Sequence, residues 1–353
     1  MQAHSTVIPL LTVAALLGAP RAQDTLADLV PAGAKFACYV DLQAMLDFVG
    51  RDLVQAAVAR LAEDEGDIRL KSDWNERLAK DWGIDPLRDI EGLLVFGDDL
   101  HGREPNLALL TTDRIDVTLG KLREMGALAS RDVGGTTIER LAPDQMLAAF
   151  GIEDAGVDVE MCLSVQRLGG RLRGHRALLV ATDADKLLPA LSAMRGAKAN
   201  DHDGALTLAT RPGCIAYVEV ADVLRELMDR SPASRMANKA THLSMQLAEN
   251  DGTVSFTAAV QTETAKDARQ IAALVNGLKA LVTLVEPDED VPQEVLEALG
   301  NAHAECDGNR VSLEFEVSRS LIDEARRSIR EELGGRGGAR QQGAGKKSRR
   351  LIR

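Results

Sequence analysis

The clearest pattern of hydrophobic and polar positions in the chain lies between residues 242 and 260. Apolar and polar residues alternate over 243–247 and again over 254–260, and Asn250-Asp251-Gly252 separates the two runs. A period of two on both sides of a glycine-containing turn predicts an antiparallel β-hairpin.

A long helix is predicted directly after this hairpin. Thr264, with Asp267 three residues later, is typical of a helix start, and the apolar pattern continues to Val285. The second half of this helix is polar only at Asn276, Lys279 and Thr283. Because a helix that is apolar on most of its circumference is usually covered on most sides, we expect it to be central to its domain.

Shorter patterns of the same two kinds predict the remaining elements. Strands are expected at 36–42, 93–96, 107–111, 136–141, 159–168, 177–182 and 311–317. Helices are expected over parts of 42–49, 115–122, 183–194, 291–299 and 318–333.

Two segments resemble each other and suggest an internal duplication. Residues 37–42 and 215–220 each contain Tyr-Val followed by an acid, and Tyr39 and Tyr217 are the only tyrosines in the chain. Each is followed by a strand pair, a helix and a further strand, so that 136–141 is expected to correspond to 311–317. The predicted fold class is therefore α+β, with two related lobes of mainly antiparallel sheet and helices packed on one face.

This reading divides the chain into five parts. They are a signal peptide (1–22), a first lobe (23–150) with an insertion at about 51–90, a connecting strand-strand-helix segment (151–211), a second lobe (212–333) and a basic tail without apolar periodicity (334–353).

The first residues resemble a secretory signal. An apolar run from Val7 to Leu17 precedes Gly18-Ala19-Pro20-Arg21-Ala22, with cleavage expected near Ala22. No lysine or arginine lies between Gln2 and Thr6, so an apolar N-terminal helix or a misplaced start codon are the alternatives. Export of a soluble protein, to the periplasm or outside the cell, is the interpretation that this pattern favours.

Charge is divided unevenly along the chain. The formal net charge is −12, although Gly334–Arg353 contains seven basic residues and no acid, so the rest carries −19. An acidic body argues against nucleic acid as a partner, because phosphate contacts need a basic surface. The tail is a candidate tether to an anionic membrane or wall polymer, or alternatively only keeps the protein soluble.

Four cysteines, Cys38, Cys162, Cys214 and Cys306, permit two disulfides in an exported chain or four free thiols. Their spacing fits no metal site. We expect Cys162 to be unbridged, since it alternates with the apolar residues around it.

Three short motifs resemble a family of uncharacterised exported bacterial proteins, of the planctomycete type, that share a domain of unknown function. They are Val30-Pro31-Ala32 leading into Tyr39-Val40-Asp41-Leu42, then Gly83-Ile84-Asp85-Pro86, and Leu179-Val180-Ala181-Thr182-Asp183. The resemblance covers 24–330. It implies a fold and an exported location, and it implies no activity, cofactor or site residue.

The sequence contains no nucleophile elbow, phosphate loop, dinucleotide fingerprint or His-Glu-x-x-His helix, and no cofactor or metal is predicted. Arg167, Arg171, Arg173 and Arg176 surround three glycines in a predicted loop. They form either an anion-binding loop or a solvated hairpin loop.

Two further patterns carry functional side chains. Residues 200–204 contain several metal-capable groups but lack the longer ligand series of a calcium loop, so a plain turn is predicted. Asp41 and Glu219 occupy matching positions in the two proposed copies. They are either a pair of catalytic carboxylates or, as the alternation indicates, residues on a solvated face.

The predicted function is therefore an exported, non-catalytic binding or scaffold protein of the cell envelope. The alternative is a hydrolase without a linear motif, with its site in a cleft between the lobes and Asp41 or Glu219 in it.

Overall fold

The computed structural model describes much of the two predicted lobes. The described residues are 29–54 except 32, 76, 78–98, 105–133, 135–142, 161–168, 174–194, 213–221, 239–282 and 297–330 except 299, 325, 328 and 329. The predicted signal sequence, the 200–204 turn, the basic tail, Arg171 and Arg173 lie outside them.

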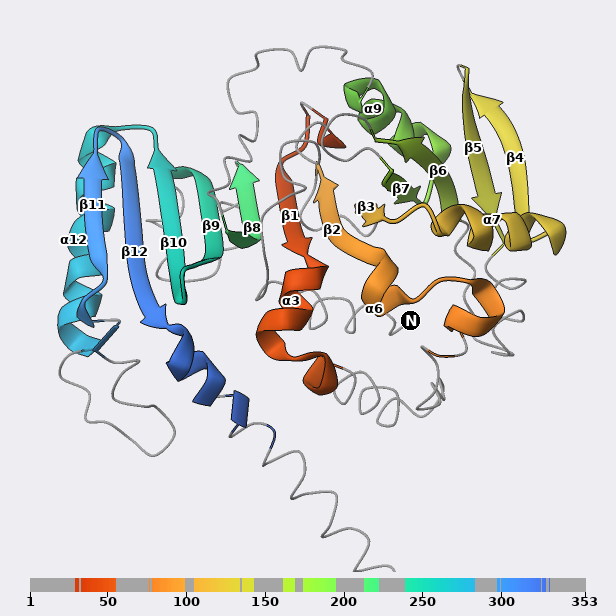
Figure 1. Ribbon diagram of the computed structural model, residues 1–353. Helices are drawn as coiled ribbons and strands as arrows, with labels where there is room; N and C mark the ends of the chain where they lie inside the picture. Colours follow the sequence, from red (N-terminus) through yellow and green to blue (C-terminus); the bar gives the residue numbers. More distant parts are fainter. Residues whose placement is uncertain are drawn as a thin grey trace, which may run out of the picture.

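One antiparallel sheet of twelve strands runs through the described residues (Figure 1). Its order is β11-β12-β10-β9-β8-β1-β2-β3-β7-β6-β5-β4. The strands are β1 (Phe36–Asp41), β2 (Ile90–Gly97), β3 (Asn106–Thr111), β4 (Leu128–Val133), β5 (Thr136–Leu141), β6 (Met161–Arg167), β7 (Arg176–Ala181), β8 (Cys214–Ala221), β9 (Ala240–Asn250), β10 (Thr253–Thr262), β11 (His303–Asp307) and β12 (Arg310–Ser318). With helices packed on this sheet, the fold class is α+β.

The two halves of the chain meet at the pairing of β1 with β8, where Tyr39 lies directly opposite Tyr217. They are thus parts of one continuous sheet. Outward from this centre the order β1-β2-β3-β7-β6 on one side parallels β8-β9-β10-β12-β11 on the other, except that the chain forms the additional strands β4 and β5 between β3 and β6.

The expected correspondence of 136–141 with 311–317 is wrong. Strand β12 pairs with β10, but the strand that pairs with β3 is β7, and β5 lies two strands further out. The segment 151–211 is therefore more than a connection, because it supplies β6 and β7 to the interior of the sheet.

The hairpin that dominates the sequence pattern is confirmed as β9 and β10. Asp251 and Gly252 both have positive φ, at 49° and 79°. This is the combination that a two-residue type I′ turn requires, and it matches the twist of the flanking strands. The register pairs Thr253 with Asn250 and continues to the far end of both strands with one irregularity at Gln261/Thr262.

Helix α12 (Ala265–Val282) begins where it was predicted to begin. The Thr264 hydroxyl accepts a hydrogen bond from the backbone N–H of Asp267 at 3.2 Å and donates one to the Asp267 carboxylate at 2.6 Å. The expectation that α12 is central is wrong, however. It packs on β10, β11 and β12 at one end of the sheet (Figure 1), and Leu274 in its second half is 49% exposed.

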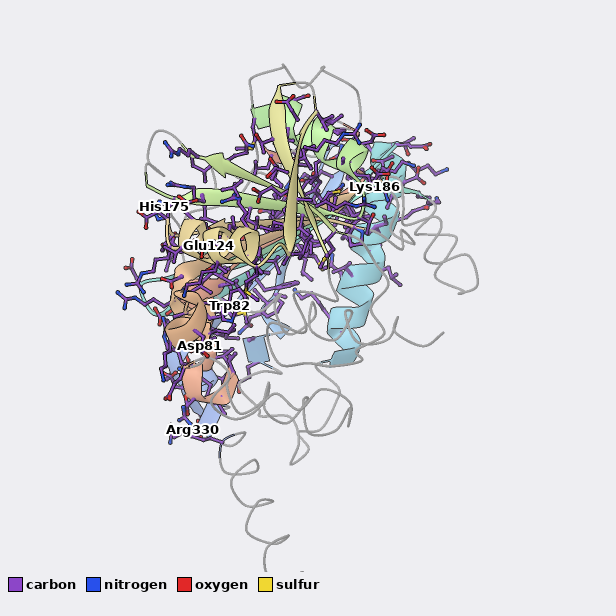
Figure 2. All side chains as sticks on the ribbon, turned by 90° about the vertical axis from the view of Figure 1, so that its right-hand side faces the viewer. Asp81, Trp82, Glu124, His175, Lys186 and Arg330 are labelled. Carbon is purple, nitrogen blue, oxygen red and sulfur yellow. The ribbon has the colours of Figure 1, made fainter. Side chains whose placement is uncertain are left out.

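Helices cover both faces of the sheet, not one. Leu119 and Leu122 of α7 (Ile115–Glu124) pack in one cluster with Leu109 and Leu178, whereas Leu187 of α9 (Ala184–Met194) packs with the alternate positions of the same strands. Because successive strand residues point to opposite faces, α7 and α9 lie on opposite faces. The side view shows Glu124 and Lys186 on the two sides (Figure 2).

An ion pair between an exposed arginine and a buried glutamate connects the end of α7 to the sheet. Arg123 contacts the Glu139 carboxylate of β5 through two nitrogens, at 2.6 and 2.5 Å. Glu139 is only 5% exposed, and its second oxygen has no hydrogen-bond partner among the described residues. Arg123 is therefore the partner that compensates the burial of the Glu139 carboxylate.

Helix α3 (Leu42–Val49) is contacted by arginines from the helical residues 319–330. Arg319 lies over the Phe48 ring at 4.5 Å, and Arg326 donates to the carbonyl oxygen of Val49 at 2.9 Å. Arg330 pairs with Asp52 at 2.7 Å. Since α3 belongs to the first half and 319–330 to the second, these contacts join the halves a second time. Along the chain, the short elements η2 (Leu78–Trp82) and α6 (Pro86–Asp89) come between α3 and β2.

Candidate functional site

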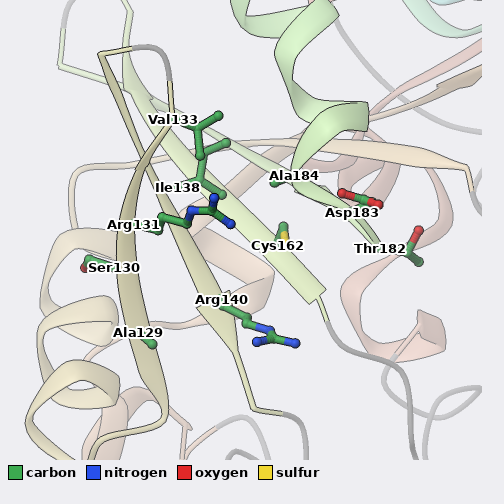
Figure 3. Close-up of a pocket in the computed structure, with 10 residues that line it drawn as sticks. All are labelled: Ala129, Ser130, Arg131, Val133, Ile138, Arg140, Cys162, Thr182, Asp183 and Ala184. Carbon is green, nitrogen blue, oxygen red and sulfur yellow. The ribbon is translucent and has the colours of Figure 1, made fainter.

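An open pocket of about 440 Å³ lies between the β4–β5–β6 part of the sheet and the beginning of α9 (Figure 3). We call it the β4–α9 pocket. Its lining residues are Ala129, Ser130, Arg131, Val133, Ile138, Arg140, Cys162, Thr182, Asp183 and Ala184.

Strand register brings the two arginines of this pocket to one face. Ala129 pairs with Arg140, and Arg131 pairs with Ile138, so all four side chains point to the same side of the β4–β5 hairpin. The next strand continues the row, because Cys162 of β6 pairs with Arg140. The face that they share is also the one on which α9 packs, since Ile138 belongs to the same core cluster as Leu187.

The polar groups around the pocket have opposite charges on its two sides (Figure 3). Arg131 and Arg140 are exposed on the strand side, and no described carboxylate pairs with Arg131. On the helix side, the Asp183 carboxylate accepts from the Asp185 backbone N–H at 3.0 Å, and the Thr182 hydroxyl accepts from Lys186 at 3.3 Å. Guanidinium groups bind carboxylates and phosphates through paired N–H donors, so the strand side suits an anionic group.

The floor of the pocket is apolar. Ile138 is 3% exposed and belongs to the core cluster, and the half-buried Val133 packs against that cluster. A ligand held here therefore has room for aliphatic atoms next to its charged group. Among the described residues no cluster of three histidine, cysteine or acidic side chains could hold a metal ion.

The arginine loop predicted as an anion site is elsewhere, and it is partly committed to other contacts. Arg176 donates to the Asp116 carboxylate at 2.8 Å and to the carbonyl oxygens of Gly174 and His175. Arg167 is exposed opposite Arg176 at the mouth of the β6–β7 hairpin. The structure describes two of the four arginines predicted to bind an anion, Arg167 and Arg176. Of these, Arg176 already pairs with the Asp116 carboxylate.

The sequence patterns did not indicate Arg131 and Arg140. Residues 128–133 read Leu-Ala-Ser-Arg-Asp-Val, with four consecutive exposed residues and no apolar alternation, so no strand was predicted there. Arg140 lies within a predicted strand, but only the pairing with β4 shows that it shares a face with Arg131. A glycine pair between 133 and 136 was the available hairpin signal.

Asp41 and Glu219 are not a catalytic pair. Glu219 lies opposite Ala37, four residues along β1 from Asp41. At about 3.3 Å per residue this corresponds to about 13 Å, beyond the roughly 10 Å that paired-carboxylate glycoside chemistry uses.

The solvated face predicted for the two acids is also wrong. Glu219 is 3% exposed and accepts a hydrogen bond from the Tyr217 hydroxyl at 2.9 Å. Asp41 instead turns to α3, where it accepts from the backbone N–H groups of Gln43 and Ala44 at 3.1 and 3.2 Å. It is the N-cap of that helix.

Burial changes the titration of the groups near the centre of the sheet. It raises the pKa of Asp41 to about 7, and the like charges of Glu91 and Asp47 add to this effect against the two backbone hydrogen bonds. Burial also raises the pKa of Tyr39, whose hydroxyl has no hydrogen-bond partner among the described residues. Its counterpart Tyr217 bonds to Glu219 two residues on, whereas the acid two residues after Tyr39 is Asp41, which caps α3.

All four cysteines are free thiols. The prediction that Cys162 is unbridged is confirmed, and Cys162 lies half-buried in the β4–α9 pocket. Cys214 is fully buried, and burial raises the pKa of the Cys38 thiol to about 11. A thiol with so high a pKa is a poor nucleophile near neutral pH.

Comparison with known proteins gives no family. No protein-family model matches the chain, and no curated protein matches it significantly. The resemblance to exported planctomycete-type proteins therefore stays a prediction. Within the described residues, no helix is long and apolar enough to cross a membrane.

Among solved structures, three crystal forms of TP0453 are similar to the chain. Form III has a TM-score of 0.40 at 10% identity over 85% of this chain and 97% of that one. Form I has a TM-score of 0.37 at 12% identity, and form IV has a TM-score of 0.39 at 10% identity. Each of these two matches covers 85% of this chain and 96% of the other. At these values the likeness supports no inference about function.

Proposed function

We propose that this chain is a non-catalytic binding protein of the cell envelope that holds an anionic group of its ligand in the β4–α9 pocket. The observation that supports it is the convergence of Arg131 and Arg140 on one open, apolar-floored pocket. The envelope location rests on the signal-like residues 1–22 alone.

Binding rather than catalysis is the role that the lining residues favour. A guanidinium stays protonated at all physiological pH values, so the two arginines attract charge but transfer no proton. The Asp183 carboxylate already accepts a hydrogen bond from the first turn of α9.

The hydrolase alternative required a cleft between two lobes. The halves are instead joined by the β1–β8 ladder, and Glu219 lies buried against Tyr217. Neither Asp41 nor Glu219 lines the β4–α9 pocket. The geometry of the described residues therefore favours the binding role.

Isothermal titration calorimetry with glutarate and with inorganic phosphate tests the pocket. We expect wild-type protein to bind at least one of these anions, and Arg131→Gln/Arg140→Gln to weaken binding by about tenfold or more, since a hydrogen bond to a charged group contributes about 1.5–3 kcal/mol. Arg167→Gln, which removes an exposed arginine from another hairpin, is the matched control and should bind as wild type. Equal binding by the double variant, or no binding of either anion by wild type, would rule out the pocket as an anion site.

Two broader parts of the proposal concern the origin and the tail of the chain. We propose that the halves arose by duplication of a strand-hairpin unit, which the Tyr39–Tyr217 pairing and the parallel strand order on the two sides of the centre, apart from β4 and β5, support. The tail 334–353, with seven basic residues, would tether the acidic body to an anionic membrane or wall polymer.

A further inference from the structure

Among the described residues, the outer edge of β4, beside the pocket, pairs with no other strand. β4 is the last strand at one end of the sheet and pairs only with β5 among the described strands (Figure 1). Four consecutive residues of β4, from Ala129 to Asp132, are exposed. An exposed edge of this kind is a template on which another strand can form hydrogen bonds.

The hairpin register shows which backbone groups of β4 point outward. Val133 and Thr136 close a two-residue turn, so this pair exchanges hydrogen bonds, and so does every second pair from it. The Ala142 N–H donates to the Ala127 carbonyl at 3.0 Å, in agreement with this parity. The odd-numbered residues of β4 therefore bond to β5, and the N–H and C=O groups of Leu128, Ser130 and Asp132 face outward.

The side chains next to this edge select for an acidic partner. On an added strand, the residues opposite Ala129 and Arg131 lie on the pocket face, with Cβ atoms about 5 Å from those of β4. An acidic side chain at such a position meets Arg131, which no described carboxylate neutralises, and Arg140 lies one strand further in. The Asp183 carboxylate at the other side of the pocket suits N–H donors, which a peptide carries and a phosphate ion lacks.

We propose that β4 binds an extended acidic peptide segment by strand addition, so that a carboxylate of the peptide enters the β4–α9 pocket at Arg131 and Arg140. The inference rests on the proposed function, because it uses the same pocket for the anionic group. A second copy of the chain is a less suitable occupant. Symmetric antiparallel pairing of two β4 edges centred on Arg131 or on Asp132 places like charges opposite each other, which is destabilising, and pairing centred on Ser130 places Ala129, not an acid, opposite Arg131.

The test uses the full chain and a fluorescein-labelled Ser-Val-Glu-Val-Glu-Val-Ser peptide, and fluorescence anisotropy of the peptide measures its binding. The same peptide with glutamine for glutamate should bind at least tenfold more weakly. Asp132→Pro removes an outward N–H without removing a bond to β5, and Asp132 does not line the β4–α9 pocket, so the variant should abolish peptide binding yet leave glutarate or phosphate binding unchanged. Asp132→Ala removes the same carboxylate, which accepts from the Gly135 N–H, but keeps the backbone N–H, so it is the matched control and should bind the peptide at least as tightly as wild type.

Hydrogen exchange gives a readout that does not depend on how the proline variant folds. In wild-type protein, bound peptide should slow exchange at the amides of Ser130 and Asp132, and it should change those of Ala129 and Arg131 much less. Unchanged exchange at Ser130 and Asp132, or wild-type peptide affinity in a folded Asp132→Pro variant, would overturn strand addition without affecting the pocket as an anion site. Loss of anion binding by Arg131→Gln/Arg140→Gln tests the pocket itself. Concentration-dependent dimers in sedimentation that Asp132→Pro abolishes would assign the edge to a second copy of the chain and overturn the peptide proposal.

Discussion

Replacing Asp41 by asparagine tests how the buried centre of the sheet constrains a helix cap. Asparagine and aspartate are about equally good N-caps, so Asp41→Asn keeps the acceptor for the N–H groups of Gln43 and Ala44. It removes only the ability to ionise. The structure predicts that this ability is costly, because burial raises the pKa of Asp41 from 3.8 to about 7.

The sign of the change in stability depends on whether the Asp41 proton binds more tightly in the folded or in the unfolded state. A pKa that is higher in the folded than in the unfolded state gives a contribution to stability that is complete below about pH 4 and is lost as pH rises through 7. The difference between 3.8 and about 7 corresponds to about 4 kcal/mol at full burial. Because Asp41 keeps some solvent contact, we expect about 2–4 kcal/mol.

Urea denaturation of wild-type protein and Asp41→Asn at pH 4, 6.5 and 8.5 measures this difference directly, since all other groups cancel. The free energy of unfolding of Asp41→Asn should equal that of wild type at pH 4 and exceed it by about 2–4 kcal/mol at pH 8.5. Asp41→Ala loses the helix cap, so its free energy of unfolding should be about 1 kcal/mol lower than that of Asp41→Asn at every pH. A gain that does not grow with pH, or a loss at pH 8.5, would refute the reasoning and show that the two backbone hydrogen bonds outweigh burial.

Three further predictions concern other parts of the chain. Arg123→Met leaves the Glu139 carboxylate buried without its partner and should lower the free energy of unfolding, measured in urea, by about 2–3 kcal/mol. Adding Glu139→Met should restore most of this loss, and an equal loss in the single and double variants would contradict the pairing. Gly213→Ala should lower the melting temperature much more than Gly252→Ala, because both have φ near +75° to +79° but only at Gly213 would a Cβ come within 2.3 Å of the Glu249 carbonyl oxygen. Deletion of 334–353 should abolish salt-sensitive binding to vesicles containing anionic lipid, and equal binding by both forms at low salt would leave the tail as a solubility segment.

Local chemistry made several elements predictable from sequence. Asp251-Gly252 supplies two positive-φ residues at the hairpin turn, and Thr264 with Asp267 starts α12 at the expected residue. The strands and helices of the α+β class followed from periods of 2 and 3.6, which depend only on neighbours in the chain. Strand β4 was missed because an edge strand, with both sides near solvent, needs no apolar alternation.

The order of residues along the chain was enough to predict the class of fold, most element positions, the hairpin turn and the charge difference between body and tail. The strand order, the burial of Glu219 and the position of Arg131 and Arg140 in one pocket with residues about α9 became known only from the folded protein. The physical reason is that turns and caps are satisfied by backbone groups within a few residues, whereas strand order and burial depend on hydrogen bonds and packing between segments far apart in the chain. Arg131 and Thr182 line one pocket although many residues separate them, and no pattern of neighbours encodes that contact.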